Sequence, residues 1–259
     1  MTPALELDKV NLSFGGVAAL SDVSIAFPEG KIIGIIGPNG AGKTSLLNVA
    51  SGVSIPDSGT VSLRGEDVSR CKPSQIAAKG LRRTFQASQL FPSMTVLENM
   101  MVGLHLEGRS GFFQCGLRTP FARAEEKEMR ERAMESLRFV GFDHFADRPG
   151  NALSFGQQRI VEIARTMIAN PKVILLDEPA VGLSVNRVGE LDTLLRKIRD
   201  ERGVTVIMIE HVIRLVMAVS DHIVVMSSGR RIAEGTADEV RANHEVVSAY
   251  LGAHQGEYH

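Results

Sequence analysis

The stretch that decides the fold is Gly37-Pro-Asn-Gly-Ala-Gly-Lys43-Thr44. An almost continuously apolar segment, residues 31–36, comes directly before it, and a segment of helical character begins at Lys43. This spacing of glycines, lysine and threonine is typical of loops that bind phosphate between a strand and a helix. The pattern arises by chance in about one chain in a hundred at average residue frequencies. The flanking strand and helix make a chance match rarer still.

Each part of this loop has a chemical task. Glycines let the backbone curl so that several N–H groups point at one phosphate chain, and the helix start adds favourable dipole charge. Lys43 can neutralise the β- and γ-phosphates, and the hydroxyl of Thr44 can bind Mg²⁺. The predicted nucleotide-binding residues of this segment are Gly37, Pro38, Asn39, Gly40, Ala41, Gly42, Lys43, Thr44 and Ser45.

A second stretch, residues 173–178 (VILLDE), places two carboxylates directly after four apolar residues. In α/β sheets ligands bind at the carboxyl ends of the strands, which is where this pattern puts both acids. Asp177 is predicted to hold Mg²⁺ through water, and Glu178 to polarise an attacking water. Taken alone the pattern is weak, because a solvated strand end or a helix cap has the same residue types.

A third stretch, residues 153–159 (LSFGQQR), precedes apolar residues at helical spacing. Ser154 and Gly156 suit a helix start with outward-pointing N–H groups, where the serine caps the helix or an anion binds. A plain helix cap is the simpler interpretation of this stretch by itself.

The rest of the chain predicts an α/β fold with added parts. Residues 4–36 predict strands, the earlier ones from alternating apolar and polar side chains. The nearly continuous apolar run at 31–36 predicts a central strand that is buried on both faces. Residues 87–155 are mostly helical in pattern, with a loop at 108–120 and an amphipathic helix at 121–140. Further along, alternating strands and helices indicate a parallel sheet with crossover helices. The expected elements there are helices at 156–169, 186–200, 212–219 and 236–251, and strands at 173–177, 204–209 and 222–226.

Composition excludes several classes of protein. Apolar residues make up 44% of the 259 residues and charged residues 23%, which excludes collagen, coiled coil and wholesale disorder. The sum of 29 basic and 30 acidic side chains is −1, so no global basic field collects nucleic acid. Cys71 and Cys115 cannot make a disulfide framework or a four-cysteine zinc site. No apolar stretch approaches the roughly 20 residues of a spanning helix, and the first residues lack a signal-peptide pattern.

Together these motifs resemble the nucleotide-binding subunit of ABC transporters. Residues 37–44 match the Walker A motif of that family, and residues 153–157 match the signature usually written LSGGQ. Asp177 matches the Walker B aspartate, and Glu178 matches the catalytic glutamate. The resemblance extends over residues 5–251.

Three further positions gain a role only through the resemblance. Gln86 matches the Q-loop glutamine, His211 the switch histidine, and Phe14 the aromatic residue that stacks on adenine. Without the other motifs, His211 would be read as a helix-start residue and Phe14 as part of the core. Six motifs in the right order are far more specific than any one of them.

The resemblance implies ATP and Mg²⁺ as cofactors and an active site shared by two subunits. Two cassettes meet head to tail, so the signature of one faces the ATP bound by the other. The implied signature contacts to nucleotide are Ser154, Gly156 and Gln157. The implied catalytic residues are Glu178, His211 and Gln86, and the implied metal-binding residues are Thr44, Gln86 and Asp177.

The resemblance also implies the domain organisation. A single nucleotide-binding domain is expected over residues 4–251. Its P-loop NTPase core, with a parallel sheet and an N-terminal antiparallel β subdomain, comprises 4–86 and 156–235. A mostly helical subdomain occupies 87–155, and a helical tail runs over 236–259.

Departures from the general pattern point to one subgroup. Phe155 stands where many members have glycine, and residues 180–184 read AVGLS where the D-loop often reads SALD. Both resemble the LivG-type subunit of bacterial branched-chain amino acid importers, as do residues 111–120 and 249–252. Ser184 stands where Asp or Asn is usual, so this chain departs from the family at the residue implied to make D-loop contact between subunits. ATPases of urea or amide importers and of lipopolysaccharide exporters remain alternatives.

The expected function is therefore a transport motor. The implied partners are transmembrane permease subunits, a second ABC ATPase (self or paralogue) and, indirectly, a periplasmic or extracellular substrate-binding protein, with no nucleic acid. The implied place is the cytoplasmic face of the inner membrane. A soluble ABC ATPase acting on ribosomes or DNA usually has tandem cassettes or long coiled-coil inserts. A non-hydrolysing regulator is disfavoured by the presence of Glu178 and His211.

Overall fold

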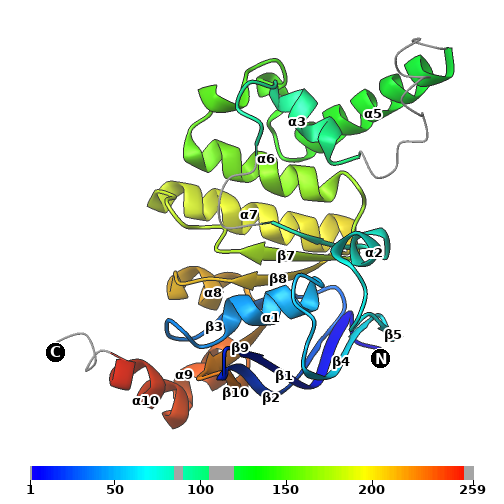
Figure 1. The fold of residues 1–259 in the computed structure, drawn as a ribbon. Helices are drawn as coiled ribbons and strands as arrows, with labels where there is room; N and C mark the ends of the chain where they lie inside the picture. Colours follow the sequence, from blue (N-terminus) through cyan, green and yellow to red (C-terminus); the bar gives the residue numbers. More distant parts are fainter. Residues whose placement is uncertain (1, 85–89, 105–119, 254–259) are drawn as a thin grey trace. The chain divides into compact units, whose positions relative to one another are not determined.

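The computed structural model describes residues 2–84, 90–104 and 120–253 (Figure 1). The chain forms two compact units, each with its own hydrophobic core. Unit 1 comprises residues 1–86 and 172–259, and unit 2 comprises residues 87–171. The chain thus returns to unit 1 at residue 172 rather than at the predicted residue 156, because the helix after the insertion packs with the helices of unit 2.

Unit 1 contains a six-stranded sheet in the order β10-β9-β3-β8-β7-β6. All neighbouring pairs are parallel except β9 with β10. The strands are β3 (Ile32–Ile36), β6 (Leu81–Arg83), β7 (Val173–Asp177), β8 (Thr205–Ile209), β9 (His222–Ser227) and β10 (Arg230–Gly235). Every residue of β3, β7 and β8 is buried, which confirms the central position predicted for the strand at 31–36 and the strands predicted at 173–177 and 204–209. Their apolar runs are continuous because both faces of the sheet are covered.

A second, antiparallel sheet has the order β2-β1-β4-β5. Its strands are β1 (Leu5–Phe14), β2 (Val17–Phe27), β4 (Ser58–Leu63) and β5 (Glu66–Asp67). In β1 the buried positions change from odd to even numbers, from Leu7 to Val10, where the pairing with β2 shifts register. Lys9 takes a left-handed conformation (φ 50°) at this irregularity. The bulge lets both halves of the strand face one core.

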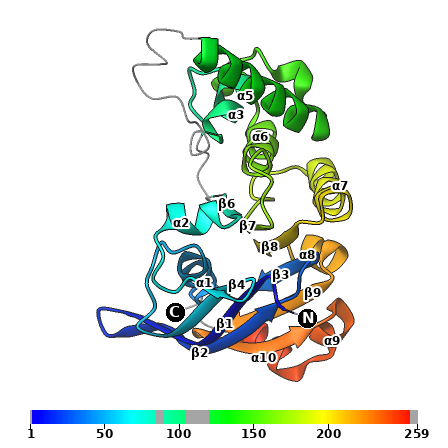
Figure 2. The same ribbon diagram turned by 90° about the vertical axis from the view of Figure 1, so that its right-hand side faces the viewer.

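Helices cover both faces of the six-stranded sheet (Figure 2). Helix α1 (Lys43–Ala50) contributes to a core shared with the antiparallel sheet. Helices α7 (Val185–Arg202) and α8 (Ile213–Val219) pack on β3 from the other side. At Gly34 a Cβ atom would lie 2.4 Å from Cγ1 of Val216, so α8 approaches β3 this closely only because Gly34 lacks a side chain. A short helix, α2 (Pro73–Ala78), precedes β6.

The predicted C-terminal helix is two helices, α9 (Ala237–Ala242) and α10 (His244–Ala253). Between them Asn243 is extended, and its side-chain oxygen accepts hydrogen bonds from the N–H groups of Glu245 (2.8 Å) and Val246 (3.3 Å). Asn243 therefore ends one helix and caps the next.

The described residues of unit 2 are mostly helical, as predicted. They form α3 (Val96–Val102), α5 (Pro120–Phe139), α6 (Phe155–Met167) and two short 3₁₀ turns, η2 (Asp143–Phe145) and η3 (Gly150–Ala152). Ala133 and Leu137 of α5 are fully buried, on the apolar face expected from their spacing. The predicted loop at 108–120 lies almost entirely outside the described residues. Within the described ranges, no helix combines the length and apolar character needed to cross a membrane.

Candidate active site

The predicted phosphate-binding loop follows β3 and has the backbone that its glycines allow. Gly37, Gly40 and Gly42 have φ values of 154°, 76° and 92°. A Cβ atom on Gly37 would lie 2.1 Å from the carbonyl oxygen of Met226, and one on Gly42 would lie 2.5 Å from that of Ala19. The curl of the loop therefore requires glycine at both positions.

The start of α1 is open to an anion. Its N-cap is Gly42, which offers no side-chain cap, and the first turn contains no acidic residue. The first N–H groups of a helix lack partners within the helix and favour negative charge. Thr44 is exposed in this turn and Ser45 is half-buried, so a phosphate chain with a bound cation fits these residues.

Lys43 lies inside the curl of the loop. Its side chain is buried, and Nζ donates to the carbonyl oxygens of Gly37 (2.7 Å) and Pro38 (3.0 Å). Burial lowers the pKa of Lys43, whereas the negative charge of Glu178 acts in the opposite direction. A buried cation favours a nearby anion, as expected of a group that binds phosphate.

At the end of β7, Asp177 is held by a residue that the sequence did not identify. A guanidinium nitrogen of Arg83 lies 2.9 Å from Oδ2 of Asp177, and both side chains are only 6% exposed. Arg83 also donates to Oδ1 of Asn48 in α1 (2.7 Å) and to Oγ of Ser51, the residue that caps the end of α1 (3.0 Å). Arg83 thus joins Asp177 to the helix that follows the phosphate loop.

Glu178 and His211 meet across adjacent strands. Asp177 of β7 is in register with Ile209 of β8, so the residues after both strands lie side by side. Oε1 of Glu178 lies 2.9 Å from Nε2 of His211. Glu178 has a left-handed backbone (φ 50°), which is uncommon for a residue other than glycine and frequent at functional sites.

Two other contacts in this region were not foreseen from the sequence. The carboxylate of Glu210, buried after β8, accepts N–H bonds from Ala180 and from its own loop. Tyr250 of α10 lies near the backbone of Gly37. Burial raises the pKa of Tyr250, and the nearby backbone of Gly37 has a smaller, opposite effect.

Of two further predicted residues of unit 1, the structure describes Phe14 but not Gln86. Phe14 ends β1 and is 55% exposed, so its ring is accessible rather than part of the core. Gln86 lies outside the described residues. Its role and that of Phe14 remain predictions.

The signature stretch begins α6 in unit 2. Ser154 is the N-cap, and its Oγ accepts from the N–H of Gln157 (3.4 Å) while Gln157 Oε1 accepts from the N–H of Ser154 (2.9 Å). Gly156, which lies between these two residues in the sequence, is half-buried. Phe155 is 44% exposed, with the Arg159 guanidinium 5.8 Å from its ring centre. The stretch is therefore a helix cap whose first side chains are accessible to a partner.

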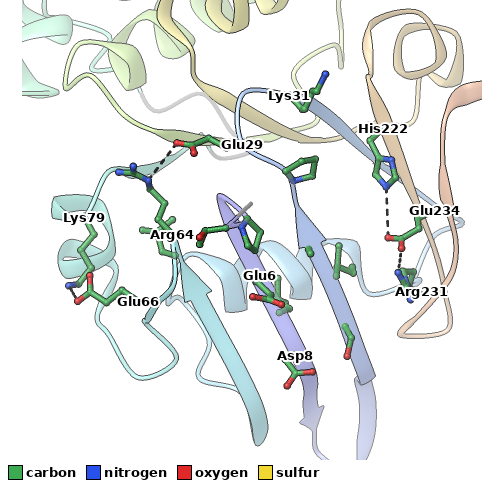
Figure 3. Close-up of a pocket in the computed structure, with 18 residues that line it drawn as sticks. Glu6, Asp8, Glu29, Lys31, Arg64, Glu66, Lys79, His222, Arg231 and Glu234 are labelled. Atoms are coloured by element: carbon green, nitrogen blue, oxygen red, sulfur yellow. Dashed lines mark hydrogen bonds and ion pairs between the residues drawn. The ribbon is translucent and has the colours of Figure 1, made fainter.

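A groove on the face of β1 opposite α1 is a different feature (Figure 3). Glu6 and Asp8 line its floor, and ion pairs such as Arg64 with Glu29 (3.6 Å) lie at its edge. None of the described residues that line this groove belongs to the predicted site.

The fold and the loops at the carboxyl ends of β3, β7 and β8 define a P-loop nucleotide-binding protein.

Comparison with known proteins agrees with the assignment as a P-loop nucleotide-binding protein. Residues 20–181 match the ABC transporter family, and residues 230–255 match the family described as branched-chain amino acid ATP-binding cassette transporter. The high-affinity branched-chain amino acid transport ATP-binding protein BraF of Pseudomonas aeruginosa is 41% identical, covering 96% of this chain and 98% of that protein. LivG of Escherichia coli is 39% identical with the same coverage.

Solved structures give the same result. The ATP-binding cassette MJ1267 of an ABC transporter has a TM-score of 0.85 and 34% identity, covering 96% of this chain and 99% of that one. The dimeric cassette MJ0796, bound to ADP and phosphate, has a TM-score of 0.75 and 27% identity, covering 90% and 98%. The chain belongs to the ABC transporter family, among its ATP-binding cassettes of the branched-chain amino acid type. It is accordingly an ATP hydrolase whose activity is coupled to transport.

Proposed function

We propose that this chain hydrolyses ATP to power the uptake of branched-chain amino acids through separate membrane subunits. The observation that carries the enzymatic part is the contact between Glu178 and His211 beside the loop that buries Lys43. The substrate is supported by full-length similarity to BraF and LivG and by the match of residues 230–255.

In the proposed reaction, the phosphate loop and Lys43 hold the triphosphate, and Glu178 accepts a proton from the attacking water. The water oxygen forms a bond to the γ-phosphorus as the bond to the ADP oxygen breaks, which yields ADP and phosphate. His211 holds the γ-phosphate and the water in line. Thr44, Asp177 and Gln86 would hold Mg²⁺, which neutralises phosphate charge. Positioning and charge stabilisation account for most of such catalysis.

The proposed active form is a head-to-tail pair of cassettes. MJ0796 forms a dimer with ADP and phosphate bound, and this chain has the same fold. Ser154, Gly156 and Gln157 of the partner cassette would add donors to the γ-phosphate, and closure would exclude water. Phe14 would stack on adenine.

Residues 87–120 are proposed to dock on a permease at the cytoplasmic face of the membrane. Phe91 is 48% exposed in this segment, whereas Phe112 and Phe113 lie outside the described residues. The alternative is that these side chains belong to the core of the segment itself. Cross-linking that maps the permease only to residues 56–67 would contradict the proposed surface.

Uptake by proteoliposomes tests the substrate. Vesicles holding the co-purified membrane subunits and this chain, with ATP on the cassette side, should accumulate labelled leucine when a binding protein is supplied. Vesicles with Glu178→Gln should not. Accumulation of urea or an amide, or release of lipopolysaccharide, without leucine uptake would assign the chain to one of the alternative systems.

A further inference from the structure

The buried carboxylate of Glu210 connects two catalytic loops of unit 1. Glu210 is 1% exposed and follows directly after β8. Its Oε1 accepts the N–H of Ala180, which lies in the loop after β7. Its Oε2 accepts the N–H groups of His211 (3.0 Å) and Val212 (3.3 Å), in the loop after β8.

Further contacts connect the same two loops beside the proposed reaction centre. Glu178 and His211 touch through their side chains at 2.9 Å, and the Glu178 N–H donates to Ile209 at 3.0 Å. Glu178 has a left-handed backbone, and such conformations persist only where the surroundings hold them. Ala180 is two residues further on, so the bond to Glu210 fixes the turn that begins at Glu178.

We propose that Glu210 is a positioning residue that holds the Glu178 loop and the His211 loop in their reactive arrangement. The inference rests on the proposed roles of Glu178 and His211. It assigns no contact between Glu210 and the substrate.

Only a carboxylate suits this position. An ionised carboxylate has two acceptor oxygens and no donor, and it can take all three N–H bonds. In Glu210→Gln one oxygen becomes an NH₂ group, which cannot accept from Ala180 in one orientation or from His211 and Val212 in the other. Burial makes such an unsatisfied N–H costly, so the loops move apart.

The test is a comparison of kcat, KM for ATP, ATP affinity and melting temperature for Glu210→Gln in the intact transport complex. We expect kcat to fall about 10–100-fold, because a displacement of about 1 Å at a reacting group has effects of this size. KM, ATP affinity and a cooperative melting transition should be retained. A kcat within about twofold of wild type would overturn the proposal.

A matched control separates positioning from stability. Oδ2 of Asp221 also accepts a backbone N–H, from Ile32 at 2.8 Å, but at the amino end of β3, away from the catalytic loops. Asp221→Asn should lower the melting temperature and leave kcat within about twofold of wild type. An equal loss of kcat in Asp221→Asn and Glu210→Gln would reduce the effect to general stability and overturn the proposal.

Glu210→Asp keeps the test decisive if the glutamine variant does not fold. The shorter side chain retains its charge and its reach to the local N–H groups of His211 and Val212, but not to Ala180. Its kcat should also fall at least about tenfold, and wild-type kcat would contradict the link between the loops. Failure of the underlying function gives a different result, because wild-type turnover would then be absent or Glu178→Gln would retain it.

Discussion

Removing the guanidinium of Arg83 is expected to destabilise unit 1 strongly. Arg83→Met keeps a similar length but leaves the Asp177 carboxylate without a cation that lies 2.9 Å away at 6% exposure. It also removes the donors to Asn48 and Ser51. Removing one partner of a buried ion pair lowers the free energy of unfolding by about 3–5 kcal/mol. For a chain of this size that corresponds to a fall in melting temperature of roughly 6–20 °C.

Thermal and urea unfolding followed by circular dichroism measure this loss. Arg64→Met is the control, since Arg64 pairs with Glu29 at 3.6 Å with both side chains about half exposed, and it should cost less than about 1 kcal/mol. Adding Asp177→Asn to Arg83→Met should recover about 1–3 kcal/mol, because the uncompensated charge is removed. If Arg83→Met unfolds no more easily than Arg64→Met, the buried pair does not have the energetic role assigned to it.

Three further outcomes are expected. Lys43→Ala should weaken ATP binding at least about tenfold in a titration, because it removes a charge-assisted contact to phosphate; equal weakening by Lys31→Ala, at an exposed position, would contradict this. Ser154→Arg should abolish turnover of the complex while its ATP affinity stays normal, whereas a serine that only caps α6 would cost about 1 kcal/mol of stability and leave turnover unchanged. Hydrogen bonds from Thr236 lower the pKa of Glu239 below its ordinary value of 4.5, so its stabilisation is present above that value and lost as the pH falls through the lowered pKa. Glu239→Gln should therefore flatten the dependence of the urea midpoint on pH below 4.5, and an unchanged slope would refute this contribution.

The central strands and the loops beside them were predictable because their signals are local. The predicted strand at 173–177 has the bounds of β7, since a continuous apolar run ending in an acid marks a strand buried on both faces. The glycines at 37–42 likewise carry their conformational requirement in the sequence. Strand β10 was not predicted, because its sequence RRIAEG is an exposed edge with little apolar alternation.

The contacts that join distant segments could not be predicted in the same way. Arg83 and Asp177 form a hydrogen bond although they are 94 positions apart in the sequence, and Glu210 and Ala180 do so although they are 30 positions apart. Such pairs depend on the strand order of the sheet, which no local pattern encodes. The approach of Tyr250 to the backbone of Gly37 similarly depends on how α10 packs.

The central claim is that Glu178 activates the water that cleaves ATP. Phosphate release by the Glu178→Gln complex, measured beside ATP binding, tests it most directly, with Glu190→Gln as a control because Glu190 is an exposed carboxylate of α7 paired with Arg187. The account predicts ATP affinity within about twofold of wild type and phosphate release at least about 100-fold slower for Glu178→Gln, with wild-type rates for Glu190→Gln. Phosphate release at the wild-type rate from Glu178→Gln would contradict the account.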